Sequence, residues 1–462
     1  MNDAFSSETA LVCPERALAG RFGPSLFVWG VWAFTLTLAL AYVARYGVNF
    51  PTWDEYVFIP QLTGERPITP AWLWSPYNGH RLVLPRLIYI GLVQASGGDF
   101  RVGMYGNVLL FGLASFALIA AARRIRGRLW YTDVVFPFAL LHLGHASCFL
   151  WSILVQFVLS SAVFCLAIAC IAEVRREVTC GRAFLIWAML VALGLSGGNG
   201  VVLVPPLGLW LVYLGARRLR SNAPGRLSRG IFLASLGMTV ILLAGFYLVG
   251  LNAGAERPEA AAGETLLGAL AFLGSSLGSI GMLTSTGAVL IGAAVALVAA
   301  AVLLTSWIAD PDSREVSSGL IMCLASVLLL ALAIGWARTG FGKDYIIDAR
   351  RFATLSAPLL CLGYMTLVRF ARRPSGRFLE MVLFTLLCAT YAYNVRDGLD
   401  HGGLLRDIRT AALRDARAGM SSQDLAQRHY ILQDKKLLAE GIEMLRRARY
   451  GPFRPTQESG GD

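Results

Sequence analysis

The amino-acid sequence predicts an all-α, polytopic integral membrane protein with about eleven transmembrane helices. Of its 462 residues, 56% are hydrophobic and only 15% are charged, which departs strongly from a soluble globular domain. Polar residues gather in a few short segments between apolar runs, several of which approach the roughly 20 residues that cross a bilayer. The eight cysteines form no CxxC pair, so neither a disulfide framework nor a zinc site is predicted.

The net charge of +12 indicates a membrane topology and not nucleic-acid binding. Lys and Arg number 41 against 29 Asp and Glu, but the arginines cluster between apolar runs. Such clusters mark the cytoplasmic ends of membrane helices. Four of them fall on one side of the predicted spans, at residues 123–128, 175–176, 217–220 and 369–377.

The predicted transmembrane domain covers residues 25–395 and follows a cytoplasmic tail, residues 1–24. The first apolar run lacks a small-residue cleavage site and has spanning length, so we do not interpret it as a cleavable signal. An odd number of spans places the carboxyl terminus outside, in the periplasm of a bacterial inner membrane. The eleven runs are residues 25–44, 102–122, 133–147, 149–171, 184–195, 201–214, 231–250, 288–307, 320–336, 352–368 and 379–394.

Two further apolar runs are not expected to cross. Residues 82–95 would form a helix of about 21 Å, too short for a hydrocarbon core of about 30 Å, so this helix should lie in the outer interface. Residues 265–283 are rich in Gly and Ser. We interpret them as an outer-face or re-entrant segment, because a further span would export the arginine clusters.

Two other segments keep alternative interpretations. Ser196-Gly197-Gly198-Asn199-Gly200 separates the fifth and sixth runs and is either a tight turn or irregular backbone that lines a site. After residue 395 hydropathy falls, and residues 396–462 should form a short periplasmic tail with amphipathic helices. This tail either caps the outer face or extends into solvent.

Candidate chemistry begins in the first outer loop, residues 45–101. Asp54 and Glu55 lie between Trp53 and Tyr56, shortly after the first span. Adjacent carboxylates can act as a general base, as ligands of a divalent cation, or both. The alternative is a solvated turn or helix cap.

Other residues could bind a substrate near these acids. A histidine can move a proton or bind phosphate, and an arginine can hold phosphate oxygens, although such arginines also anchor helices to headgroups. Aromatic rings can stack on sugars or form an interfacial belt. A polar side chain within a span faces a cavity or another helix. The candidates are His80, Arg81, Trp53, Tyr56, Trp74, Tyr77 and Gln156.

A late outer loop, residues 338–351, is an exception to the cytoplasmic bias of positive charge. It carries Lys343, Arg350 and Arg351 beside glycines. Such a cluster suits a lipid-linked phosphate or pyrophosphate, and headgroup contact is the simpler alternative.

This layout resembles the C-type membrane glycosyltransferases, which include protein mannosyltransferases and the aminoarabinose lipid A transferase. The resemblance rests on the acidic Asp54-Glu55 motif in the first outer loop, the interfacial helix after it and the many spans. It implies a polyprenyl-phosphate-linked sugar donor, inverting transfer, Asp54 as base, and Arg350 and Arg351 against the lipid phosphate. Glu55 would orient the acceptor or hold a divalent cation.

The sequence leaves alternatives open for the acceptor and for the class of protein. The tail is too short for a large soluble domain, so a glycan, lipid or protein acceptor stays open. A flippase or other transporter of lipid-linked saccharides would share the outer arginines, but should show internal repeats. An O-antigen ligase or polymerase would use a similar donor with a longer late loop.

Overall fold

The structure confirms the predicted fold class: the protein is all-α, and its long apolar helices are typical of a polytopic membrane protein. The computed structural model describes residues 14–221, 225–251, 261–282, 285–341, 345–371, 374–429 and 434–454. Within these residues, ten helical segments are long and apolar enough to cross a membrane. A two-stranded hairpin, β1 (Pro76–Tyr77) and β2 (His80–Arg81), is the sheet in the described part of the chain.

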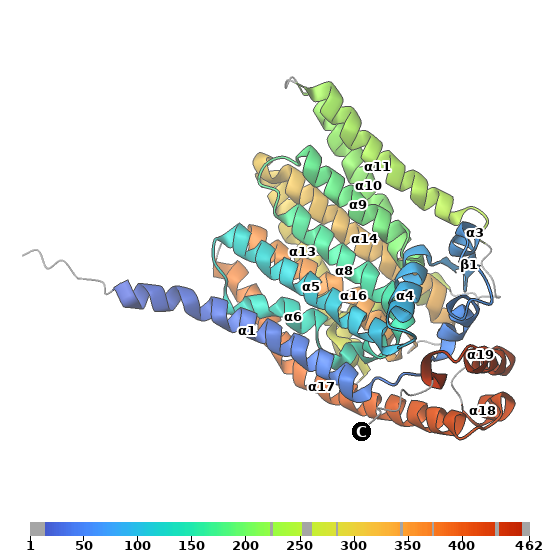
Figure 1. Ribbon diagram of the computed structural model, residues 1–462. Coiled ribbons are helices and arrows are strands. Elements are labelled where there is room, and N and C mark those ends of the chain that lie inside the picture. Colours follow the sequence, from blue (N-terminus) through green and yellow to red (C-terminus); the bar gives the residue numbers. More distant parts are fainter. Residues whose placement is uncertain are drawn as a thin grey trace, which may run out of the picture.

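The long helices pack side by side as a bundle (Figure 1). Two shorter apolar helices, α4 (Val83–Ala95) and α9 (Cys180–Gly194), accompany them. The long helices are α1 (Pro14–Tyr46), α5 (Arg101–Arg126), α8 (Val155–Ala172), α10 (Gly198–Leu219), α11 (Arg226–Leu248), α13 (Ser285–Ala309), α14 (Arg314–Arg338), α16 (Arg351–Phe370) and α17 (Pro374–Arg417). The remaining candidate is α12 (Ala262–Gly274), which reaches spanning length only together with the 3-10 turns that follow it.

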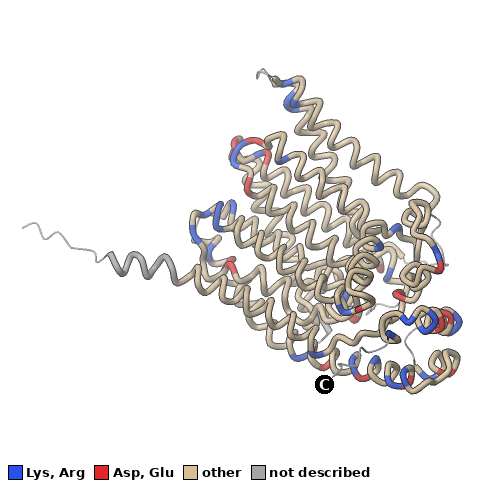
Figure 2. The backbone as a smooth tube through the Cα atoms, in the orientation of Figure 1, with Lys and Arg blue, Asp and Glu red and all other residues tan. Residues whose placement is uncertain are grey.

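The four arginine clusters lie at one end of the bundle, called here the arginine-rich end. Arg124 pairs with Glu173 at 2.7 Å, linking the ends of α5 and α8. Arg218 pairs with Glu315 at 2.9 Å, linking the end of α10 to the start of α14. Charged residues gather at the two ends of the bundle and are nearly absent between them (Figure 2). The opposite end, which holds the first loop, is called the site end.

The segment predicted as a span at residues 133–147 crosses the bundle as broken helices, so the prediction of one regular helix is wrong here. It runs through η2 (Tyr131–Val134), α6 (Val135–Leu140), η3 (Leu143–His145), α7 (Ala146–Phe149) and η4 (Ser152–Leu154). The segment is almost wholly buried, and Asn107 donates to the Cys148 carbonyl at 2.8 Å. Irregular backbone is tolerated at this depth because the protein itself satisfies its polar groups.

Helix α12 and the following η5 (Ser275–Met282) form a re-entrant segment at the site end. Ser275 contacts Ser356, near the start of α16, with their hydroxyls 2.9 Å apart. Asn394 in α17 accepts a hydrogen bond from the Ser279 amide at 2.8 Å. Helix α13 then crosses the whole bundle, so the segment before it both begins and ends at the site end. This geometry matches the re-entrant interpretation.

Helix α4 lies across the site end, as its length predicts. Its first turn is tied to the end of α9, because the Leu84 amide donates to the Leu195 carbonyl at 3.0 Å. After its last turn, the Phe100 amide donates to Asn49 at 2.9 Å, beside the start of the first loop. Both ends of α4 are therefore at the same end of the bundle.

The carboxyl-terminal tail caps the first loop. Helix α17 continues without interruption for 44 residues, so the boundary predicted at residue 395 falls inside it. Helices α18 (Ser422–Arg428) and α19 (Lys435–Arg447) follow. The backbone of Gly441 in α19 packs against the ring of Tyr56, and Arg447 pairs with Glu65 at 3.0 Å. The contacts favour the cap over a solvated extension.

One buried ion-pair network fixes the arginine-rich end. Arg126 contacts both Asp133 and, at 3.0 Å, Glu380; the side chains of these acids are 0% and 5% exposed. Arg126→Met would leave two buried carboxylates unpaired. We expect this variant to lose about 3–5 kcal/mol of stability, measured by denaturation of the purified protein in detergent.

The matched control is Arg124→Met, because Arg124 is 68% exposed in its pair with Glu173. An exposed pair contributes about 1 kcal/mol or less. Equal losses for the two variants would contradict a structural role of the buried network.

Candidate functional site

The loop after α1 is shaped by a short 3-10 helix, η1 (Trp53–Phe58), that separates the two adjacent acids. Trp53 has a left-handed backbone with φ of 46°, a strained conformation for a bulky residue. Its ring packs on Trp151 at 4.6 Å between centroids. Asp54 faces a cavity, whereas the next residue of η1, Glu55, is buried in the protein interior.

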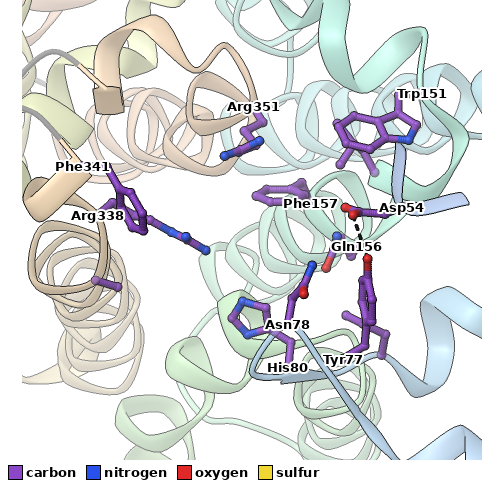
Figure 3. Close-up of a pocket in the computed structure, with 13 residues that line it drawn as sticks. Asp54, Tyr77, Asn78, His80, Trp151, Gln156, Phe157, Arg338, Phe341 and Arg351 are labelled. Carbon is purple, nitrogen blue, oxygen red and sulfur yellow. Dashed lines mark hydrogen bonds between the residues drawn. The ribbon is translucent and has the colours of Figure 1, made fainter. Parts of the chain in front are cut away.

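A tight hairpin brings Tyr77 to Asp54. Its two turn residues, Asn78 and Gly79, have φ of 47° and 71°, the positive values that a two-residue hairpin turn of this type requires. The Tyr77 hydroxyl donates a hydrogen bond to Asp54 Oδ1 at 2.7 Å (Figure 3). The hairpin therefore sets the orientation of the carboxylate.

The glycine-rich start of α10 packs against His80, the residue after the hairpin turn. A β-carbon at Gly198 would lie 2.4 Å from His80 Nδ1, and Gly197 has a φ of 126°. Only glycine permits this close approach of ring and backbone. The segment is thus a tight turn between α9 and α10 in which Gly197 has a positive φ, and it packs against His80, a residue that lines the cavity.

The side chains enclose a cavity of about 340 Å³ at the site end. Asp54 is the acidic residue among the described residues that line it, and two arginines face it from α14 and α16 (Figure 3). Tyr77, Trp151, Phe157 and Phe341 contribute aromatic rings to its walls. The lining residues are Asp54, Tyr77, Asn78, His80, Leu82, Trp151, Leu154, Gln156, Phe157, Ala337, Arg338, Phe341 and Arg351.

Burial raises the pKa of Asp54 above its ordinary value, while the Tyr77 hydrogen bond and the charge of Arg351 oppose that rise. A carboxylate with a raised pKa is a better proton acceptor than an exposed aspartate, because basicity follows pKa. Burial and the neighbouring Asp54 raise the pKa of Tyr77 well above its ordinary value. Tyr77 therefore stays protonated and remains a donor.

A second cavity of about 430 Å³ adjoins the first. The two share Asp54, Trp151, Leu154 and Arg351. The second is also lined by Trp53 and Arg350. Arg350 donates two hydrogen bonds to Asp397, at 3.0 and 2.9 Å, so its charge is neutralised within the protein. Arg351 is shared by both cavities and contacts the Tyr345 hydroxyl.

Glu55 lines neither of these two cavities. It is fully buried, and its Oε2 accepts the Thr52 amide at 2.9 Å. Burial raises the pKa of Glu55 to about 7, opposed by backbone hydrogen bonds and by the charge of Arg409. Arg409, from the extension of α17, is itself buried and donates to the Leu150 carbonyl. The two adjacent acids are therefore in different environments: Asp54 lines a cavity, and Glu55 is buried in the protein.

Three other predicted site residues lie in the packing around the first loop. Arg81 donates to the carbonyls of Trp74 and Val249, each at 2.6 Å, so it binds backbone. Trp74 stacks on Phe246 with centroids 5.1 Å apart. Tyr56 is fully buried against α19. Lys343 lies outside the described residues.

Five of the predicted site residues line this one cavity, and several residues that were not predicted line it too. The five are Asp54, Tyr77, His80, Gln156 and Arg351. The Asn-Gly pair of the hairpin was a usable signal, because this dipeptide strongly favours a two-residue turn. Arg338 and Phe341 belong to the late loop that the sequence marks as basic, although neither was named as a site residue. Trp151 and Phe157 have no local sequence feature that distinguishes them from ordinary loop or helix residues.

The side chains of the described residues do not form a metal site by themselves. In the described part of the chain, no group of three or more His, Cys, Asp or Glu side chains could hold a metal ion. A hard cation such as Mg²⁺ is often held by one carboxylate together with substrate phosphates. Asp54 could serve such a cation only with ligands from a substrate.

Together, the fold and cavity define a polytopic α-helical membrane protein with a carboxylate, a tyrosine and arginines facing one cavity at an end of its helices. Comparison with protein-family models and with curated protein sequences finds no match to the chain.

The raised pKa of Glu55 predicts a pH-dependent stability. Glu55 titrates near 7 in the fold, against an ordinary value of 4.5. The protonated fold is therefore favoured below about pH 4.5, and that advantage is lost as pH rises through 7. We expect wild-type stability to fall across this window by roughly 3 kcal/mol, at about 1.4 kcal/mol per pKa unit.

Glu55→Gln should remove this slope, measured as melting temperature against pH in detergent. The absolute stability of the variant can also fall, because glutamine has only one side-chain oxygen that can accept hydrogen bonds from backbone N–H groups, whereas glutamate has two. The slope is therefore the diagnostic quantity. An unchanged slope in Glu55→Gln would show that another group causes the pH dependence.

Proposed function

We propose that the protein is a membrane glycosyltransferase that moves a sugar from a polyprenyl-phosphate donor to an acceptor hydroxyl. The observation that carries the proposal is Asp54. This carboxylate has a raised pKa, is held by Tyr77, and faces arginines across a cavity at the end of membrane helices. A base opposite cationic groups is what a transfer with an anionic leaving group requires.

In the proposed reaction the acceptor hydroxyl attacks the anomeric carbon and gives its proton to Asp54. The new bond joins the acceptor oxygen to that carbon, and the bond from the carbon to the phosphate oxygen breaks. Attack from the side opposite the phosphate inverts the anomeric configuration. The electron pair of the broken bond leaves with the lipid phosphate.

The leaving phosphate is assigned to Arg351 and Arg338. Both line the cavity, and guanidinium groups bind phosphate oxygens through charge-assisted hydrogen bonds. Arg350 and Arg81 are less suited, because a carboxylate and backbone carbonyls already occupy their donors. Of the arginines predicted from the sequence to bind the phosphate, only Arg351 is therefore retained here.

Sugar binding is supported by the cavity walls. Trp151, Phe157 and Phe341 present apolar faces to it, while Gln156 and Asn78 add hydrogen-bonding groups. Such a combination suits a sugar ring, which has an apolar face and polar edges. Lipids of the membrane and the acceptor, whether glycan, lipid or protein, are the other proposed partners.

Charge asymmetry supports the placement of the site outside. The four arginine clusters gather at the end of the bundle opposite the cavity, and the positive-inside rule assigns that end to the cytoplasm. In a bacterial inner membrane the site end would then face the periplasm, where lipid-linked donors are available after their translocation. No nucleic acid is involved in this proposal.

Asp54→Asn preserves shape but removes the proton acceptor, so turnover with a polyprenyl-phosphate sugar should fall by about 10² or more. Donor binding should persist, because the arginines remain. The measurement is sugar transfer by purified protein in detergent, with donor binding measured separately.

The control is Asp99→Asn, the same change in the same loop. Asp99 pairs with Arg101 at 2.7 Å and lies outside both cavities, so transfer should be nearly unaffected. Wild-type turnover by Asp54→Asn would overturn the catalytic assignment.

The pH profile tests the surroundings of Asp54. Transfer should decline as pH falls through its pKa, because the protonated carboxyl cannot accept a proton. Arg351 and Tyr77 both lower that pKa. The acid limb of kcat against pH should therefore move to higher pH in Arg351→Gln and in Tyr77→Phe. A limb that stays in place in both variants would show that another group limits the reaction.

A further inference from the structure

A basic cavity at the arginine-rich end has no part in the proposed transfer. It has a volume of about 400 Å³ and lies between the end of α5, the end of α16 and the start of α17. Its residues come from segments far apart in the chain. They are Ile125, Arg126, Arg128, Trp130, Val368, Arg369, Ala371, Arg377 and Glu380.

Three guanidinium groups surround the single indole of Trp130. The Cζ atoms of Arg126 and Arg128 each lie 5.4 Å from the ring centroid, and that of Arg377 lies 4.8 Å away. The Trp130 backbone amide donates to Asp133 at 2.8 Å, which fixes the backbone from which the indole projects. The ring face attracts each cation, but the cations repel one another.

Only part of this positive charge is neutralised. Arg126 contacts Asp133 and Glu380. Among the residues that the structure describes, Arg128 and Arg377 have no ion pair, and both are exposed. An anion between them would relieve the repulsion and accept hydrogen bonds from two guanidinium groups.

The surface beside the cavity indicates what carries that anion. Phe378, Met381 and Val382 follow Arg377 at helical spacing on α17 and are 68%, 50% and 47% exposed. This apolar stripe runs from the basic cavity toward the middle of a predicted span, where hydrocarbon chains would cover it. A free phosphate would use the arginines alone, whereas a phospholipid would also cover the stripe.

We infer that this cavity binds the headgroup phosphate of an anionic phospholipid, with an acyl chain along the exposed stripe of α17. Trp130 arranges the arginines around the phosphate. Basic cavities between membrane helices are suited to such headgroups, each nearby arginine contributing about 1 kcal/mol. The inference is independent of the transfer reaction.

The test measures phosphatidylglycerol binding to the purified protein by native mass spectrometry, with phosphatidylcholine as the zwitterionic comparison. Arg128→Gln combined with Arg377→Gln should weaken phosphatidylglycerol binding roughly 30-fold. Trp130→Leu keeps all the charges and should also weaken binding. Arg128 and Arg377 are exposed and Trp130 is half-buried. Thermal unfolding verifies that each variant is folded.

The matched control combines Arg123→Gln with Arg220→Gln, which removes two exposed charges from the same end of the bundle. This control should bind phosphatidylglycerol as the wild type does. Equal loss in the control, or full binding by the Arg128 and Arg377 variant, would overturn the inference. Displacement of the lipid by millimolar inorganic phosphate would also overturn it, in favour of a free-phosphate site.

Discussion

An irregular loop packed against membrane helices must satisfy its backbone carbonyls, and two buried arginines meet this requirement here. Arg81 binds the carbonyl of Trp74 and, at the end of α11, those of residues 247 and 249. Arg86 binds the carbonyls of residues 72, 73 and 75. Removing such a partner leaves polar groups unpaired in a poorly hydrated region. The position of the hairpin, and through Tyr77 that of Asp54, depends on these contacts.

Hydropathy and charge predicted most of the architecture, because spanning length and arginine placement are properties of local sequence. They failed at residues 133–147, where apolar composition resembles a span but the chain uses short helices whose polar groups are satisfied by neighbours such as Asn107. These neighbours come from other parts of the chain, so the local sequence does not indicate them. The boundary at residue 395 failed similarly, since α17 stays helical after hydropathy falls.

The candidate site was predictable in its centre and not in its periphery. Asp54 was conspicuous as an acid in a mostly apolar chain, and Tyr77 and His80 shared its loop. Asp54 and Glu55 are adjacent residues of η1 and point in different directions, and the sequence does not indicate which of the two faces the cavity. Arg338 and Arg351 reach the cavity from the two ends of the late loop whose positive charge the sequence indicated, but only the tertiary structure shows that both arginines face Asp54.

The cap has a consequence for the order in which the chain is made. Tyr56 and Glu65 belong to the first loop, but their contacts are with Gly441 and Arg447, close to the end of the described chain. During synthesis the first loop therefore leaves the ribosome long before its covering helices do. Until those helices dock, the loop around Asp54 is incomplete. Covering of the first loop is thus tied to the synthesis of α19, so a chain interrupted before α19 would insert its spans and leave that loop without its cap.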